Sequence, residues 1–316
     1  MVVNKSWLFL FKLVVSGGLI YWILRNSDLQ EVGNSLISAD RLLLSVAFLL
    51  LFVGYFLTAF RWRTLIRAQE SDAPVLQLVK SFMVALFFNN FLPSTIGGDV
   101  VRMYDSWRII GSRSIAVTVV IVDRFLGVIA LFSFALIALT IDVQVSAHVP
   151  FIGLWVSLTG GAVLGLAFVV LFLPTRVLDT LGQLKKPLLS SVIQVLRKIL
   201  ESFQVYRRKK PAVLMAFGLS LALQFNVVIH FILIAHGVGI QIPATSMFLI
   251  IPIAVFVMML PIAINAIGVR ETVFVVLLSY YGVPIHQGLA LAWVSFGFTL
   301  MQGVLGGFVF GIRKYA

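Results

Sequence analysis

Long apolar runs restrict the fold of this chain more than any other feature of its sequence. A helix that crosses a bilayer needs about 20 predominantly apolar residues. Runs of roughly that length with little or no charge lie at six places, which are 7–24, 42–60, 114–141, 151–173, 212–235 and 288–312. Only helices and closed barrels satisfy their backbone hydrogen bonds inside a bilayer. The sequence therefore predicts an all-α, polytopic membrane helical bundle, with residues 1–316 forming one integral-membrane domain.

The composition excludes several classes of protein. Hydrophobic residues make up 60% of the chain, charged residues 11%, and mean hydropathy is +1.07, whereas charged residues approach about a quarter of a soluble domain. The absence of cysteine excludes a disulfide framework, thiolate metal sites and cysteine catalysis. The net charge of +12 would suggest nucleic acid in a soluble protein. In a membrane protein it marks loops that face anionic lipid, so we expect no nucleic-acid partner.

Lysine and arginine predict the orientation of the chain, because cytoplasmic loops carry an excess of both. They are dense at 61–80, 98–113 and 174–211, and the opposite loops hold only Arg25, Arg41 and Arg270. Both termini are thus predicted to be cytoplasmic. No small-residue cleavage site follows the first apolar run, so we expect it to be a retained helix rather than a signal peptide. We expect the protein in the inner membrane of a bacterium or archaeon.

A broken apolar stretch lies between the second and third long runs. Residues 81–91 are too few to span a bilayer, end on Asn89 and Asn90, and are followed by Pro93, Gly97 and Gly98. This pattern predicts a helix that enters the membrane, breaks and turns back. Backbone of that kind is tolerated only where it is buried in protein or lines a wet cavity. Broken helix ends offer N–H groups and a helix dipole to a ligand.

A stretch similar to residues 92–102 occurs 168 residues later in the chain. Residues 260–270 match residues 92–102 at Leu, Pro, Ile, Val and Arg without a gap, which indicates an internal repeat. When the chain is oriented by the lysine and arginine content of its loops, the two interrupted segments are expected to enter from opposite faces of the membrane. We therefore predict two inverted repeats, approximately 42–141 and 212–312, each with a re-entrant helix pair and with a binding site between them. Residues 185–206 show the spacing of an amphipathic helix on the inner leaflet; a solvated linker is the alternative.

Charged residues at the first break suggest a site for an anion. Arg102 can hold a phosphate by two parallel hydrogen bonds, and Asp99, three residues earlier on the same helix face, would fix its rotamer. The structural alternative is a helix cap next to a cytoplasmic arginine. Asp123 and Arg124 lie inside an apolar run, the costliest placement in the chain. Adjacent helical side chains point about 100° apart, so the two cannot simply pair with each other, and we expect one of them to partner Arg102, Asp99 or the cavity. Lining of the cavity is the first interpretation, and a structural interhelical ion pair is the alternative.

The second half offers weaker candidates. Arg270 and Glu271 follow Asn265 and Gly268, and they would either receive a headgroup on the outer side or form a structural ion pair. On one apolar helix, Asn226 and His230 are four residues apart and share a face. Interhelical hydrogen bonding is the first interpretation of this pair, and lining of the path is the second. The four histidines have no metal-ligand spacing, so we expect no metal, no cofactor and no catalytic residue.

The motifs together resemble the flippase-like integral-membrane domain family of bacterial lysylphosphatidylglycerol synthases. The resemblance rests on Leu92-Pro-x-x-x-Gly97-Gly-Asp-x-x-Arg102, on Val122-Asp-Arg124 and on Gly268-Val-Arg-Glu271. It implies a lipid-translocating module in which the charged residues of these motifs line or brace a headgroup cavity. Full synthases continue into a soluble transferase domain and this chain stops at Ala316, so lysyl transfer is not implied. The repeated stretch 260–270 also departs from the pattern, because Asn265-Ala-Ile stands where another glycine would be expected. Its role in binding a ligand is therefore less well supported than that of 92–102.

Three functions remain open from the sequence. The first is a lipid flippase or lipid-binding transporter that takes an anionic headgroup between the two repeats and is not an enzyme. The second is a membrane-embedded headgroup or glycosyl transferase that uses polyprenyl-phosphate or phospholipid. The third is a non-transporting subunit that binds lipid for a partner enzyme; a homo-oligomer is also possible. The residues expected to bind lipid are Asn89, Asn90, Pro93, Gly97, Gly98, Asp99, Arg102, Asp123, Arg124, Asn226, His230, Asn265, Gly268, Arg270 and Glu271.

Overall fold

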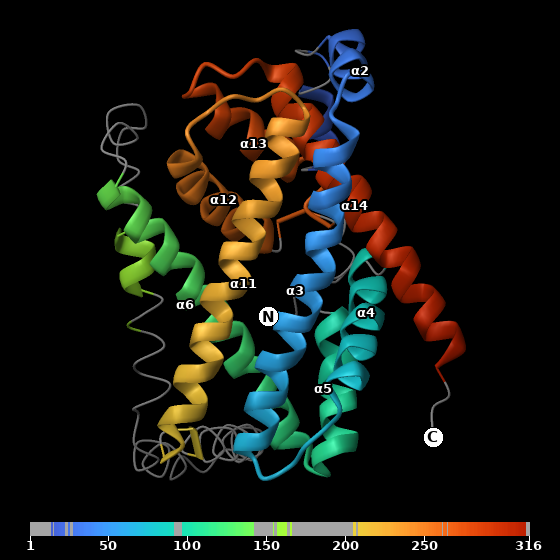
Figure 1. Ribbon diagram of the computed structural model, residues 1–316, viewed down its shortest axis with the longest axis vertical. Coiled ribbons are helices and arrows are strands. Elements are labelled where there is room, and N and C mark those ends of the chain that lie inside the picture. The colour runs from blue at the N-terminus through green and yellow to red at the C-terminus, as the bar shows by residue number, and fades with distance from the viewer. Residues whose placement is uncertain are drawn as a thin grey trace.

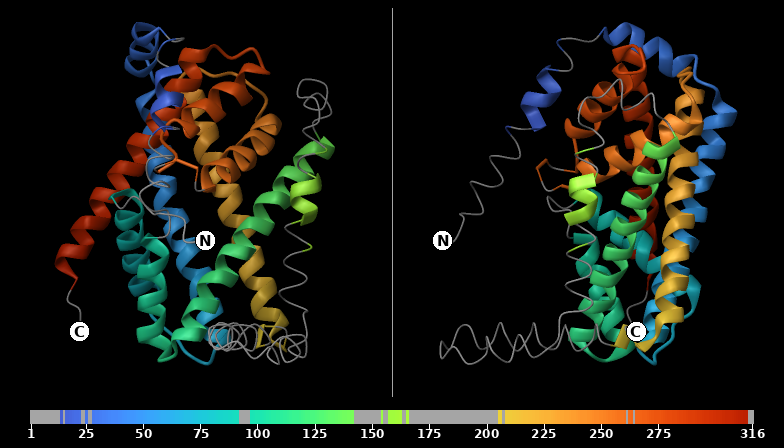
Figure 2. Two further views of the ribbon diagram at one scale, coloured as in Figure 1. Left: turned by 180° about the vertical axis from the view of Figure 1, so that it is seen from behind. Right: turned by 90° about the vertical axis from the view of Figure 1, so that its left-hand side faces the viewer.

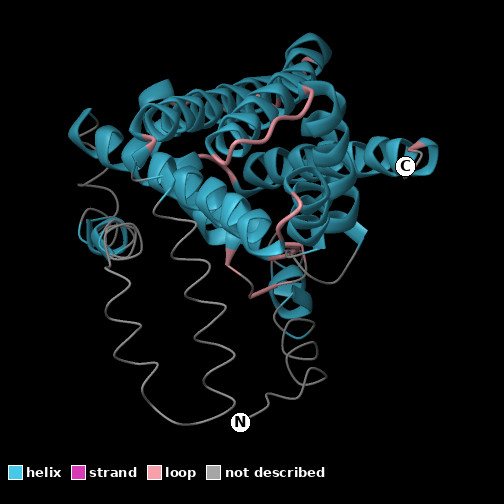
Figure 3. Ribbon diagram, turned by 90° about the horizontal axis from the view of Figure 1, so that it is seen from below, coloured by secondary structure: helices cyan, strands magenta, loops and turns pink. Residues whose placement is uncertain are grey.

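The computed structural model is a bundle of α-helices (Figure 1). It describes residues 28–91, 97–141, 208–260, 262–263 and 265–313, with shorter pieces at 14, 16–22, 25, 154, 157–162, 165 and 205–206. Across these residues no strand occurs, and the view from below shows only helices joined by loops (Figure 3). The prediction of an all-α fold is confirmed.

Four helices are long and apolar enough to cross a membrane. They are α3 (Arg41–Ala68), α6 (Arg113–Ile141), α11 (Lys210–Gly237) and α14 (Ile285–Ile312). They confirm the spans predicted at 42–60, 114–141, 212–235 and 288–312. The other two predicted spans, 7–24 and 151–173, lie largely outside the described residues, and so does the amphipathic helix expected at 185–206.

The helix α3 extends further than its apolar run. Asp40 caps its first turn by accepting hydrogen bonds from Leu42 N at 2.8 Å and Leu43 N at 3.1 Å. The run of uncharged residues ends before Arg61, but the helix continues to Ala68. Arg61, which the charge count placed in a loop, therefore lies within the helix. α3 packs along α11 (Figure 1).

Short helices occupy both interrupted segments. α4 (Val75–Phe91) and α5 (Gly97–Ile110) are separated by a break, and so are α12 (Ala244–Met259) and α13 (Val269–Ser279). None of the four is long enough to count as a membrane span. Figure 1 places α4 and α5 side by side in the lower half of the molecule and α12 and α13 in the upper half, below α2 (Leu29–Ile37). The helices thus break where the sequence predicted.

The two breaks are not equivalent in register. Arg102 is the sixth residue of α5, whereas Arg270 is the second residue of α13. The matched arginines therefore stand at different heights on their helices, because the second segment winds into a helix later along the chain. Asn265 and Ala266 have positive φ angles of 49° and 56° and precede α13. The residues aligned with them in the first segment, Gly97 and Gly98, already belong to α5.

The helix α14 joins the two halves. Its C-terminal part packs closely on α4: a Cβ atom on Gly306 would lie 2.0 Å from the carbonyl oxygen of Met83. The α14 ribbon is inclined to α4 and α5 toward its C-terminal end (Figure 2, left), and Arg313, directly after the helix, donates to Asp105 of α5 at 2.8 Å.

Candidate functional site

A cavity of about 390 Å³ lies where seven helices meet. A volume of this size falls within the range typical of small-molecule sites, roughly 300–1,000 Å³. Its wall is formed by residues of α3, α4, α5, α6, α11, α12 and α14. The wall combines apolar residues with polar and charged ones. These are Tyr55, Thr58, Arg61, Asn89, Asp99, Arg102, Asp123, Arg124, Gln224, Asn226 and Gln302.

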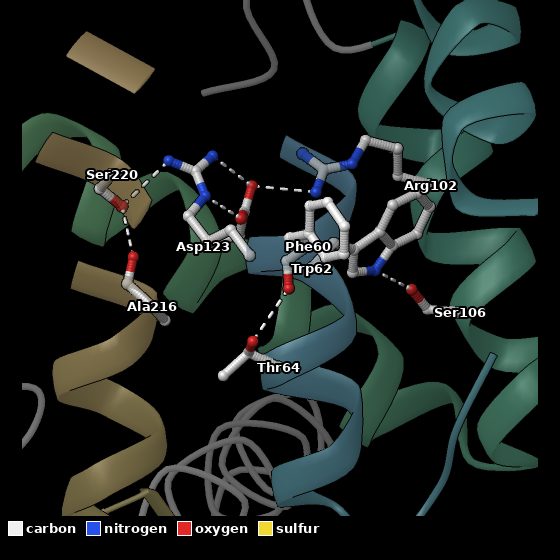
Figure 4. A network of polar contacts seen from close by, with 9 residues as sticks. Phe60, Trp62, Thr64, Arg102, Ser106, Asp123, Ala216 and Ser220 are labelled. Carbon is white, nitrogen blue, oxygen red and sulfur yellow. Dashed lines mark hydrogen bonds and ion pairs between the residues drawn. The ribbon is translucent and has the colours of Figure 1, made fainter. Parts of the chain in front are cut away.

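The carboxylate of Asp123 is the centre of an ion-pair network (Figure 4). Arg61 donates to it from Nε at 2.6 Å and from Nη2 at 3.0 Å. Arg102 brings Nη2 to 2.9 Å from the same carboxylate. Only 1% of the Asp123 side chain is exposed. A carboxylate this deeply buried is tolerated because two guanidinium groups face it.

The guanidinium of Arg61 also reaches a third helix. Its Nη1 donates to the hydroxyl of Ser220 at 3.1 Å, and that hydroxyl donates to the carbonyl oxygen of Ala216 at 2.9 Å. Arg61 thus ties α3 to α6 through Asp123 and to α11 through Ser220. Because its hydrogen bonds are directed to these fixed partners, Arg61 is a structural member of the wall.

A second ion pair crosses between α5 and α6. Arg124 Nη2 lies 2.5 Å from Asp99 Oδ2. The sequence predicted that Asp99 would pair with Arg102 on its own helix, and this prediction is wrong. Asp99 and Arg102 both turn toward α6, where Arg124 and Asp123 provide closer partners of opposite charge. The adjacent residues Asp123 and Arg124 find separate partners, as their angular separation required.

Arg102 retains hydrogen-bonding capacity. Its guanidinium carbon stacks 4.6 Å from the ring centre of Trp62, and the Trp62 indole donates to the Ser106 hydroxyl at 3.0 Å. The aromatic ring therefore orients Arg102 without using its N–H groups. Among the described residues, its Nε and Nη2 are buried and find no partner with hydrogen-bond geometry. Arg102 is therefore the guanidinium in this cavity best prepared to receive an anion.

The charge of the cavity is positive. Three arginines (Arg61, Arg102 and Arg124) and two aspartates (Asp99 and Asp123) line it. Each aspartate is compensated by an arginine, and one positive charge remains. An excess charge in a largely apolar cavity favours an anionic ligand over a neutral one.

The residues that flank the break between α4 and α5 contribute to the cavity wall through Asn89 and Gly98. Asn89 Oδ1 accepts a hydrogen bond from Gly98 N at 2.8 Å, so it satisfies a backbone donor at the start of α5. A Cβ atom on Gly98 would lie 2.5 Å from the carbonyl oxygen of Ala85, which requires glycine there. Asn90 instead donates to Thr299 O on α14 at 2.6 Å. Gly97 begins α5, and Pro93 lies outside the described residues.

The second break lies apart from this cavity. Glu271 caps α13 by accepting a hydrogen bond from Gly268 N at 2.7 Å. The Arg270 guanidinium stacks 4.8 Å from the ring centre of Phe296 and approaches the carbonyl oxygen of Asn265 at 3.5 Å. None of the predicted residues Asn265, Gly268, Arg270 and Glu271 lines the cavity. Arg102 and Arg270 therefore do not share it, and no residue of α13 is among its lining residues.

The polar residues of α11 divide between two roles. Asn226 lines the cavity together with Gln224. His230 Nδ1 lies 2.8 Å from the carbonyl oxygen of Ala47 on α3, which is the interhelical hydrogen bond that the sequence favoured. His230 is thus a packing residue.

Sequence reasoning missed Arg61, Trp62 and Ser220. The signal for the first two was present, since Trp62, Leu65 and Ile66 continue an apolar helix face beyond the first charge of the segment. No sequence signal distinguishes Ser220 from other serines in apolar helices. In the part of the chain that the structure describes, no cluster of His, Cys, Asp and Glu could hold a metal ion.

Comparisons with known proteins agree with the membrane architecture. Residues 9–307 match the family described as the lysylphosphatidylglycerol synthase TM region. The chain is also similar to a UPF0104 membrane protein of Pyrococcus horikoshii, with 23% identity over 187 residues. That alignment covers 58% of this chain and 52% of the relative, so the chain spans about half the length of this curated relative. The match and the four long apolar helices identify a multi-pass membrane protein.

Proposed function

Since the chain belongs to the lysylphosphatidylglycerol synthase transmembrane-region family, we propose that it binds an anionic phospholipid and carries its headgroup across the membrane through the central cavity. The acyl chains would stay in the bilayer while the headgroup enters between the helices. Membrane lipids are then its partners and substrates, and the protein acts as a transporter rather than as an enzyme.

The observation that carries this proposal is the state of Arg102. Its guanidinium is buried, oriented by Trp62 and left with unused donors in a cavity of net positive charge. A phosphate oxygen pair suits such a group, because guanidinium binds phosphate through two parallel hydrogen bonds. The cavity supports a phosphodiester headgroup better than it supports a neutral ligand.

The network around Asp123 provides a way to exchange partners. When Arg102 turns to a phosphate, Asp123 keeps its two hydrogen bonds from Arg61 and is not left as an uncompensated buried charge. When the lipid leaves, Arg102 returns to Asp123. Arg61 is thus the constant partner and Arg102 the exchanging one, which lowers the cost of releasing the headgroup.

The broken helices suggest how access alternates. We propose that the pairs α4–α5 and α12–α13 are re-entrant and enter from opposite faces, as the two arms of inverted repeats. Their short lengths and their positions in opposite halves of the molecule support this arrangement (Figure 1). The concentration of lysine and arginine near the α4–α5 pair supports a cytoplasmic location for that end, with both termini on the same side of the inner membrane.

Reconstitution tests the proposed transport. The protein is placed in liposomes with headgroup-labelled phosphatidylglycerol or phosphatidylcholine, and loss of label accessible to an external quencher is followed. Arg102→Gln should slow movement of phosphatidylglycerol by about tenfold or more, since hydrogen bonds to charged groups contribute about 1.5–3 kcal/mol. The fold should persist, because Asp123 keeps Arg61.

The matched control is Arg41→Gln, which removes an exposed arginine at the far end of α3. It should move lipid at the wild-type rate. Equal rates for Arg102→Gln and the wild type would remove Arg102 from the mechanism. Mass analysis of the lipids after the assay separates transport from headgroup transfer, because a transferase would change their chemical identity.

A further inference from the structure

A second and larger hollow lies outside the central cavity, at the basic end of the molecule. It has a volume of about 950 Å³ and lies between the start of α4, the end of α5 and the end of α14. We call it the basal groove. The ribbon of α14 is inclined to α4 and α5 at this end of the molecule (Figure 2, left). Its lining residues are Pro74, Leu76, Gln77, Lys80, Asp105, Arg108, Ile109, Val309, Ile312 and Arg313.

Two of the lining residues of the basal groove, Asp105 and Arg313, form an ion pair. Arg313 donates to Asp105 from Nη1 at 2.8 Å and from Nη2 at 2.9 Å. The hydroxyl of Ser81 donates to the same carboxylate. Asp105 is only 4% exposed, so its charge is neutralised within the protein. This pair fixes the end of α14 against α5 and leaves no uncompensated acid in the lining.

The remaining charges of the groove are positive. Lys80 on α4 and Arg108 on α5 both line it and are exposed. The lining residues include three basic side chains (Lys80, Arg108 and Arg313) and one acidic side chain (Asp105), so basic groups predominate in the groove. Two basic side chains at the mouth of a groove attract an anion, and the inner leaflet of a cell membrane is rich in anionic lipid.

The outer wall of the groove is apolar. Ile109 comes from α5, and Val309 and Ile312 come from the last turns of α14. Ile312 is 77% exposed and its neighbour Phe308 is 71% exposed. Side chains this apolar and this exposed at the end of a membrane-spanning helix are suited to contact acyl chains. The groove thus presents basic groups beside an apolar wall, which matches the two parts of a phospholipid.

We propose that the basal groove binds an anionic phospholipid of the adjacent leaflet, with its phosphate at Lys80 and Arg108 and an acyl chain along Val309 and Ile312. This site is separate from the central cavity, since Arg102 lines only the cavity and Lys80 only the groove. Binding here does not depend on lipid transport. It requires only that lipid at this end of the protein be selected by charge.

Quenching measurements at a single introduced thiol test the site. The natural chain has no cysteine, so an Ile312→Cys variant can be labelled with bimane at that position alone. The labelled protein is placed in nanodiscs that contain doxyl-phosphatidylglycerol or doxyl-phosphatidylcholine at equal mole fraction. Doxyl-phosphatidylglycerol should quench the bimane fluorescence more strongly than doxyl-phosphatidylcholine. Its binding constant relative to phosphatidylcholine should be raised roughly fivefold for each basic side chain.

Variants locate the selectivity. Adding Lys80→Ala and Arg108→Ala should bring the two lipids to equal quenching. A matched control, Arg63→Ala with Arg67→Ala, removes two positive charges from the same end of the molecule outside the groove and should keep the preference. Arg102→Gln should also keep it, which separates this site from the proposed transport cavity.

Salt provides a test that needs no change to the basic side chains of the groove. Raising the ionic strength to about 1 M shortens the Debye length to about 3 Å, so the preference for phosphatidylglycerol should fall markedly. Equal quenching by the two lipids at low salt would overturn the proposal. The proposal would also fail if the Arg63 and Arg67 control lost the preference as completely as the groove variant.

Discussion

The stability of the central network should depend on Asp123 far more than on a similar carboxylate at the surface. Asp123 faces Arg61 and Arg102 at distances of 2.6–3.0 Å, and its side chain is 1% exposed. Asp123→Asn leaves both guanidinium groups buried without a counter-charge. Loss of one partner from a buried ion pair costs about 3–5 kcal/mol, and we expect a loss of unfolding free energy in that range.

The chain contains a matched control for this experiment. Asp72 also faces two arginines, with Arg63 at 2.8 Å and Arg67 at 2.9 Å, but its side chain is 46% exposed. Surface ion pairs contribute little because water already solvates both charges. Asp72→Asn should therefore change stability much less than Asp123→Asn does.

Equilibrium unfolding in detergent, followed by tryptophan fluorescence, measures both variants. Arg61→Met provides an intermediate case, because Asp123 then keeps Arg102 and only the hydrogen bonds from Arg61 are lost. The expected order of destabilisation is Asp123→Asn, then Arg61→Met, then Asp72→Asn. Equal losses for Asp123→Asn and Asp72→Asn would show that Asp123 is not held in a low-dielectric network, and they would refute this account of the cavity.

Three further predictions concern other parts of the molecule. Gly98→Ala should lower the melting temperature and slow lipid transport, since its Cβ would lie 2.5 Å from a carbonyl oxygen of α4; Gly218→Ala, with no atom within 4 Å of its Cβ, should be neutral or stabilising by about 0.5–1 kcal/mol. The two arginines beside Asp72 hold the pKa of its carboxyl well below the usual range. Its contribution should therefore be constant between about pH 5 and pH 8 and disappear only as the pH falls below the ordinary value near 4, which melting curves of wild type and Asp72→Asn at each pH will show. A thiol introduced by Lys210→Cys should react with an impermeant maleimide only from the cytoplasm, and one introduced by Gln241→Cys only from the opposite side; the reverse labelling would refute the charge-based orientation.

Local sequence patterns were sufficient for the four long helices and for the interruption of the short pairs, but they did not predict α2 (Leu29–Ile37), which lies in a segment expected to be a loop. The apolar runs predicted all four long helices, and the proline and glycine positions predicted where the first short pair is interrupted. These features depend on residues near one another in the chain. The end of α3 was misplaced because the first charge, Arg61, was read as the end of the span. Its helix continues because Asp123, 62 residues away, compensates that charge inside the protein.

The pairing of charges depended on tertiary structure. Asp99 and Arg102 lie three residues apart on α5, and a local rule pairs them. The structure pairs them instead with Arg124 and Asp123, which α6 brings to the same height. The prediction that Arg270 shares a cavity with Arg102 was wrong for a related reason. Equal spacing from a shared proline did not give equal helical register, because α5 begins at Gly97 soon after α4 ends at Phe91, whereas α13 begins only at Val269 after α12 ends at Met259.

Direct binding to the central cavity is the measurement closest to the central claim. Calorimetric titration with short-chain phosphatidylglycerol is best made in the Lys80→Ala and Arg108→Ala background, which leaves the central cavity as the site examined. Adding Arg102→Gln should weaken the affinity by about tenfold or more, and short-chain phosphatidylcholine should bind much more weakly than phosphatidylglycerol. Unchanged affinity on loss of Arg102, or equal affinity for the two lipids, would contradict the claim that this guanidinium receives an anionic headgroup.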